Sequence, residues 1–160
     1  MSYIDSDLEF SDSQAVTASA VGTNVIDLSL AKNLGNGEPM SVVFTVEVAA
    51  DQTSSDEDYE FQVEYATNAA QSTGRQLVGS RHFESGTPTA PAQDADLLIA
   101  GFKVVIPLPA TASSEVGQFL GIRYVTAGTS PTITVSASLT LSSMIETNVD
   151  GGSAIGYTIS

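Results

Sequence analysis

Short runs of alternating apolar and polar residues recur along the chain and predict β-strands. The clearest run spans residues 132–141, where every second residue is apolar and the others are Ser or Thr. Residues 59–65 alternate Tyr, Phe and Val with Glu60, Gln62 and Glu64, which predicts a half-buried strand with its acids in water. Turn-forming residues separate further predicted strands at 23–30, 40–48, 75–83, 97–108 and 118–126.

About seven or eight such strands, with turns at sandwich-like spacing, predict an all-β, antiparallel β-sandwich. No segment keeps a capped 3.6-residue period, so at most one short helix is expected. The run 97–108 is apolar on both faces and predicts a buried strand interrupted near Gly101. We divide the chain into an extended N-terminal arm (1–22), a β-sandwich domain (23–141) and a C-terminal tail (142–160).

The excess of acidic residues and the lack of cysteine exclude several classes of partner and site. The 160 residues contain 19 acids and 5 Lys or Arg, for a net charge of −14. Such a field repels phosphate backbones and anionic lipids, so we expect neither nucleic-acid nor membrane partners. No run is long and apolar enough to span a bilayer, and residues 1–7 do not read as a signal peptide. The absence of cysteine excludes disulfides, zinc–thiolate sites and thiol nucleophiles.

Candidate catalytic chemistry is sparse. His82 is the single histidine, and the nearby Ser80 and Ser85 lie in no Gly-x-Ser-x-Gly motif, so we expect a structural or surface histidine and no enzyme. Gly35-Asn36-Gly37 lacks the context of a phosphate-binding loop and predicts a turn. The scattered cations are expected to be ion-pair partners within or between subunits: Arg75, Arg81, Lys103 and Arg123.

Two acidic sets could offer oxygen ligands to a hard cation. These sets are Asp56-Glu57-Asp58 and the group Asp5, Asp7 and Glu9. Neither has the spacing, central Gly and terminal Glu of a calcium loop. We therefore predict solvated acids, with no metal site and no cofactor.

Two segments match a known family in order and spacing. The first runs Tyr3-Ile4-Asp5-x-x-Leu8-Glu9-Phe10-Ser11-Asp12-x-Gln14-Ala15-Val16-Thr17-x-Ser19-Ala20 and continues with Thr23-Asn24-Val25-Ile26-Asp27-Leu28. The second is Gly35-Asn36-Gly37-Glu38-Pro39 before a Val-rich strand, and a looser match covers Leu97 to Pro109. In these segments the chain resembles the Bbp16-type capsid cement proteins of tailed bacteriophages.

The resemblance implies a jelly-roll-like sandwich that forms homotrimers and performs no catalysis. It implies that the trimers, made in the host cytoplasm, sit on the outer capsid surface of the virion. There they bridge subunits of the major capsid protein, which is the expected partner together with further copies of this chain. The two-sided strand 97–106 and the apolar tail are candidates for the trimer interface.

Within that interpretation the N-terminal arm is the candidate capsid-binding element. It carries sizeable apolar side chains among acids, which docking on another subunit could bury. The candidate residues are Tyr3, Ile4, Asp5, Asp7, Leu8, Glu9 and Phe10. We expect the acids of this set to face the capsid, and Asp56, Glu57 and Asp58 to face solvent.

Two alternatives stay open at this stage. The segment could instead be the first strand of the sandwich, paired within its own sheet. The whole chain could instead be a carbohydrate-binding β-sandwich module on a virion or cell surface, although it lacks the Trp residues that serve as sugar platforms.

Overall fold

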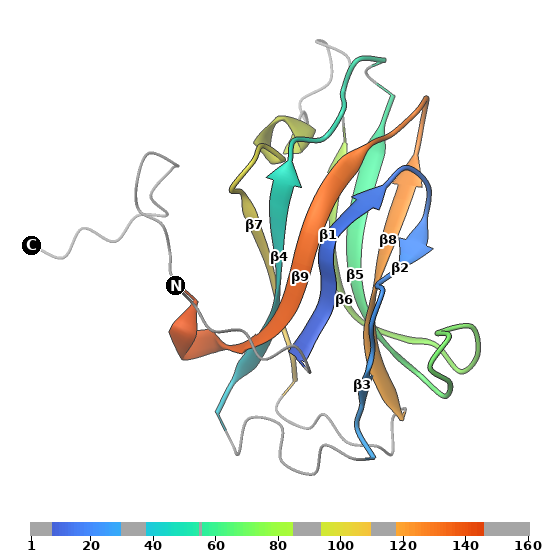
Figure 1. Cartoon of the computed structure of the whole chain (residues 1–160), viewed down its shortest axis with the longest axis vertical. Helices are drawn as coiled ribbons and strands as arrows, with labels where there is room; N and C mark the ends of the chain where they lie inside the picture. The colour runs from blue at the N-terminus through green and yellow to red at the C-terminus, as the bar shows by residue number, and fades with distance from the viewer. Residues whose placement is uncertain (1–7, 30–37, 55, 85–93, 110–117, 146–160) are drawn as a thin grey trace, which may run out of the picture.

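Two antiparallel sheets lie face to face in the computed structural model, which describes residues 8–29, 38–54, 56–84, 94–109 and 118–145 (Figure 1). The first sheet has the order β1 (Glu9–Val16), β9 (Ile133–Leu141), β4 (Met40–Val48) and β7 (Lys103–Pro107). The second has the order β2 (Ala20–Val21), β8 (Phe119–Ala127), β5 (Asp58–Ala66) and β6 (Gln76–Glu84), and β3 (Ile26–Asp27) also pairs with β8. The predicted all-β antiparallel sandwich is confirmed.

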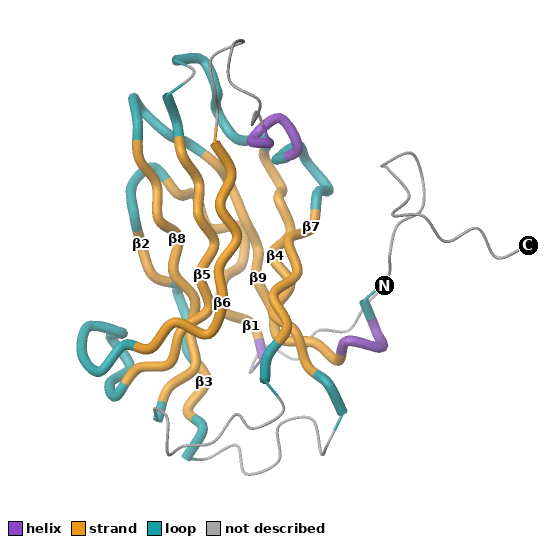
Figure 2. The backbone as a smooth tube through the Cα atoms, turned by 180° about the vertical axis from the view of Figure 1, so that it is seen from behind, coloured by secondary structure: helices purple, strands orange, loops and turns teal. Residues whose placement is uncertain are grey.

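Helical structure in the described part of the chain is limited to short 3₁₀ turns. The two that lie wholly within the described residues are η3 (Asp94–Leu97), just before β7, and η4 (Ser142–Met144), directly after β9. Figure 2 shows η3 at one end of the sandwich and η4 beyond the end of β9.

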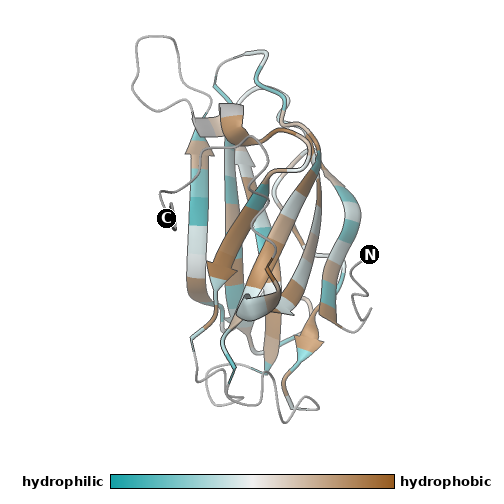
Figure 3. Cartoon of the chain, turned by 90° about the vertical axis from the view of Figure 1, so that its left-hand side faces the viewer, coloured by the Kyte–Doolittle hydropathy of each residue, from teal (hydrophilic) through white to brown (hydrophobic). Residues whose placement is uncertain are grey.

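The core fills the space between the two sheets, because alternate residues of each strand point inward. Hydrophobic and hydrophilic bands accordingly alternate along the strands in Figure 3. At its centre, Phe44 of β4 packs against Phe61 of β5 with ring centroids 5.3 Å apart, and both contact Tyr124 of β8 at 6.0 Å. The aromatic cluster therefore ties the two sheets together.

Most predicted strands form close to their predicted bounds. Residues 40–48 are β4, and β5, β6, β8 and β9 each lie within one or two residues of the expected range. In these segments alternation and β-branched or aromatic content point to the same structure, and the local signal is sufficient.

Two predicted strands are shorter than expected. In 23–30 only Ile26 and Asp27 pair with β8, because Asp27 accepts hydrogen bonds from the backbone N–H (2.9 Å) and hydroxyl (2.6 Å) of Ser29 and so turns the chain. In 97–108 the extended part is only β7, an edge strand, and Gly101 has a φ of +90°. The interruption predicted near Gly101 is confirmed, but Leu97 and Ile99 are more than half exposed, so the prediction of a buried strand before Gly101 is wrong.

The proposed boundary between arm and sandwich is also corrected. Residues 9–16 form β1 beside β9, and residues 20–21 form β2 beside β8, so both belong to the sheets. The described residues thus favour the alternative in which this segment is the first strand. Residues 1–7 and most of the tail, 146–160, lie outside the described residues.

Candidate functional site

The structure describes only some of the predicted capsid-binding residues, and those it describes belong to the sandwich. Leu8 packs against the core, Glu9 is half-buried opposite Ser138, and the side chain of Phe10 is fully buried. Asn24 fixes this start: its backbone N–H donates to the carbonyl of Phe10, and its side-chain amide donates to the carbonyl of Glu9, both at 2.9 Å. Phe10 is therefore a core residue rather than a docking residue; Tyr3, Ile4, Asp5 and Asp7 lie outside the described residues.

The loop before β5 is held by its own acids. Glu57 is fully buried, and its carboxylate accepts hydrogen bonds from the backbone N–H groups of Ser54 (3.0 Å) and Asp56 (3.2 Å). Asp56 is exposed but accepts hydrogen bonds from the backbone (3.1 Å) and hydroxyl (2.9 Å) of Thr129, in the turn between β8 and β9. The expectation that Glu57 faces solvent is wrong, because its carboxylate organises the loop from inside.

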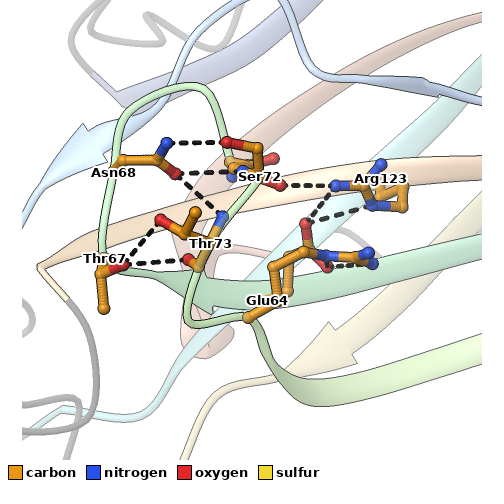
Figure 4. Close-up of polar contacts among 8 residues, drawn as sticks. Glu64, Thr67, Asn68, Ser72, Thr73 and Arg123 are labelled. Atoms are coloured by element: carbon orange, nitrogen blue, oxygen red, sulfur yellow. Dashed lines mark hydrogen bonds and ion pairs between the residues drawn. The ribbon is translucent and has the colours of Figure 1, made fainter.

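A buried charge cluster lies on the outer face of the second sheet (Figure 4). Glu64 of β5 has a side chain only 2% exposed, and its two carboxylate oxygens pair with Arg75 (2.8 Å) and Arg123 (3.0 Å). The prediction that the acids of this strand lie in water is therefore wrong for Glu64. The prediction that scattered cations serve as ion-pair partners is confirmed for Arg75 and Arg123.

The loop between β5 and β6 folds onto that cluster. Asn68 braces it by accepting hydrogen bonds from the backbone N–H groups of Ser72 (3.0 Å) and Thr73 (3.3 Å), as Figure 4 shows. The braced loop presents the carbonyl of Gln71 to the guanidinium of Arg123 at 2.8 Å. Loop and strand β8 are thereby joined through a charged hydrogen bond.

Gln71 completes the contact by lying against β8. Its amide is oriented to donate to the carbonyl of Ile122 (2.9 Å) and to accept from the N–H of Gly121 (3.1 Å). A Cβ on Gly121 would collide with this amide, so the glycine leaves the space that the buried glutamine fills. Gln71 itself has a φ of +52°, in the left-handed region, which the surrounding contacts offset.

At the other end of the β5–β6 pair, three potential metal-ligating side chains come together. Asp58 of β5 lies directly opposite Glu84 of β6, and His82 lies two residues earlier on β6. Their donor atoms lie within 4.8 Å of one another, and His82 Nδ1 is 3.4 Å from Glu84 Oε1. Sequence reasoning missed this set, because 24 to 26 residues separate Asp58 from the other two. Aligning the two predicted strands as an antiparallel pair, with Asp58 opposite Glu84, would have brought the three residues together.

No helix among the described residues is long and apolar enough to cross a membrane. The fold and these sites define an acidic antiparallel β-sandwich protein with a loop-covered outer face. The sequence matches the family model described as Bbp16 over residues 10–139, and the chain belongs to the Bbp16 family. The matched span begins in β1 and ends in β9, so it includes both sheets. Membership indicates a phage-associated protein. No curated protein matches the sequence.

Proposed function

We propose that the chain is a capsid cement, or decoration, protein that trimerises on the outer surface of a tailed-phage capsid and stabilises the lattice of the major capsid protein. The observation that carries this proposal is membership of the Bbp16 family across the whole sandwich. The strand orders β1-β9-β4-β7 and β2-β8-β5-β6, with β2 and β3 both on β8, support description of the sandwich as a jelly roll of one four-stranded and one five-stranded sheet.

The proposed mechanism is mechanical rather than catalytic. A trimer offers three equivalent attachments, and linking weak attachments raises the overall avidity by about 10²–10⁴-fold. Because the trimer binds only the assembled lattice, binding shifts the equilibrium toward that lattice by mass action. A trimer needs a ring-closed interface in which each subunit contacts the next through two different patches.

The corrected position of β1 moves the proposed capsid contact toward the N-terminus. Phe10 and Leu8 are used by the sandwich, so the residues left for docking are those before β1: Tyr3, Ile4, Asp5 and Asp7. They join a strand that is paired along its length with β9, so load on them passes directly into the first sheet.

Binding to undecorated capsids tests the proposal. Capsids assembled without this protein are mixed with the full chain, with a variant lacking residues 1–7, or with Asp56→Asn as a surface control, and are then sedimented. We expect the full chain and Asp56→Asn to coat the capsids and raise their melting temperature, and the truncated chain to bind at least about tenfold more weakly. Absence of coating by the full chain would refute the cement function, and glycan binding in its place would favour the carbohydrate-binding alternative.

A further inference from the structure

We propose that Asp58, His82 and Glu84 form a surface site for a divalent transition-metal ion such as Zn²⁺, on the outer face of the β5–β6 pair. This site is separate from the capsid contact and does not depend on the cement function.

The register of the two strands places the three side chains on one face. Tyr59 and Phe83 are paired with each other and are buried in the core, so the residues that flank them point outward. Asp58 and Glu84 are a directly opposed pair, and His82 is on the same face as Glu84, two residues away. The site is thus built on paired backbone rather than on a loop, which holds its ligands in place.

The distances fit a single ion. The imidazole nitrogen and the two carboxylate oxygens lie within 4.8 Å of one another. Two ligand atoms that are each about 2.1 Å from a tetrahedral zinc ion lie about 3.4 Å apart, which is the separation that His82 Nδ1 and Glu84 Oε1 already have. Side-chain rotations that close each remaining gap by about 1.4 Å or less therefore bring all three into coordination distance, and His82 and Glu84 lie on the exposed surface.

The donor set selects the class of metal. One imidazole and two carboxylates suit Zn²⁺ and its neighbours, whereas Mg²⁺ and Ca²⁺ prefer all-oxygen sets. Like charges placed directly opposite on paired strands are destabilising, and a dication between Asp58 and Glu84 offsets that repulsion. Three protein ligands leave a fourth position of a tetrahedral ion for water or for a group of another molecule.

The single histidine makes a sharp test possible. Its imidazole C–H resonances in the NMR spectrum of the full chain belong to His82 alone. We expect ZnCl₂ to shift or broaden these resonances with one-to-one saturation, and MgCl₂ at the same concentration to leave them unchanged. Removal of a residue that merely supports a ligand costs about 10–100-fold in metal affinity, so loss of a ligand in His82→Ala or Glu84→Gln should weaken zinc binding by at least tenfold in calorimetry.

Glu60→Gln is the matched control. Glu60 lies opposite His82 but outside the three-residue set, and the substitution removes the same charge as Glu84→Gln. We expect it to weaken zinc binding clearly less than Glu84→Gln does, because Glu60 attracts the ion from a neighbouring position without coordinating it. Circular dichroism of each variant checks that the sheet is retained. Equal weakening by Glu60→Gln and Glu84→Gln would mean diffuse attraction to acidic charge and would overturn the site, as would zinc binding that His82→Ala leaves unchanged.

Discussion

Gly121 shows how one missing side chain decides where a loop lies. A Cβ at this position would displace the Gln71 amide from its hydrogen bonds to β8. We expect Gly121→Ala to lower the free energy of unfolding by about 1–3 kcal/mol, as for other overpacked sites. Gln71→Ala in the same chain removes the obstructing amide, so the double variant should lose less than the sum of the single losses. Urea denaturation of all four proteins checks this, and strict additivity would contradict the proposed contact.

Glu47 makes stability depend on pH. Hydrogen bonds from the hydroxyls of Ser13, at 2.6 Å, and Ser136 hold the pKa of its carboxyl below the ordinary value of 4.5. A lowered pKa in the folded state means that ionised Glu47 stabilises the protein above about pH 4.5 and that this contribution is lost as the pH falls through the folded-state value. Between pH 6 and pH 3 the melting temperature of Glu47→Gln should therefore fall less than that of the unmodified protein. A parallel fall in both proteins would refute this role.

At the scale of elements, β1 is part of the fold rather than an appendage. Phe10 is fully buried in the core, so Phe10→Ala should cost about 3–5 kcal/mol of unfolding free energy. Deletion of residues 1–7 leaves β1 intact and should cost less than about 1 kcal/mol. Thermal denaturation compares the two variants. A small loss of stability in Phe10→Ala would contradict the assignment of β1 to the core and favour its interpretation as an arm.

In the charge cluster under the β5–β6 loop, the two arginines should contribute unequally to the free energy of unfolding. The Arg123 side chain is 20% exposed and holds both Glu64 and the carbonyl of Gln71, whereas Arg75 is 42% exposed and holds Glu64. Arg123→Ala should therefore cost about 1.5–3 kcal/mol, the range for hydrogen bonds to charged groups, and Arg75→Ala about 0–1 kcal/mol. Chemical denaturation measures both, and equal losses would show that the loop contact adds nothing.

Local pattern was enough to predict the long strands but not their partners. Alternation located β4, β5 and β9, because each is long and has one face in the core. It failed for β1, where bulges between Glu9 and Gln14 and the positive φ of Ser13 break the two-residue period. It also failed for Glu64 and for the Asp58, His82 and Glu84 set, since those environments arise only from pairing with residues distant in sequence.

For the whole molecule, if the proposed cement function holds, the net charge of −14 should govern the rate at which the protein encounters the capsid. If the acids before β1 face cationic capsid loops, their attraction speeds association, so neutralising Asp5 and Asp7 should slow it. The same change should reduce the salt dependence of association, because salt screens this attraction, with a Debye length of about 8 Å at physiological ionic strength. Neutralising Asp56 and Asp58, as the control pair, should leave the on-rate nearly unchanged. Stopped-flow or surface binding measurements at several salt concentrations distinguish the two pairs, and equal effects would refute a directed encounter.

The pairing of the first strand with the last has a consequence under tension. Glu9, at the start of β1, lies opposite Ser138, near the end of β9, so the chain enters and leaves the sandwich at the same end. A pulling force between the two termini would act at this one end of the β1–β9 pair. It would break the hydrogen bonds between the two strands one after another rather than loading them all at once. A load between the N-terminus and the opposite end of the sandwich would instead run along β1 and stretch these hydrogen bonds together, so the protein would resist it more strongly. If the proposed cement function holds, a swelling capsid would therefore be restrained better by attachments through one end of each subunit than by attachments through both.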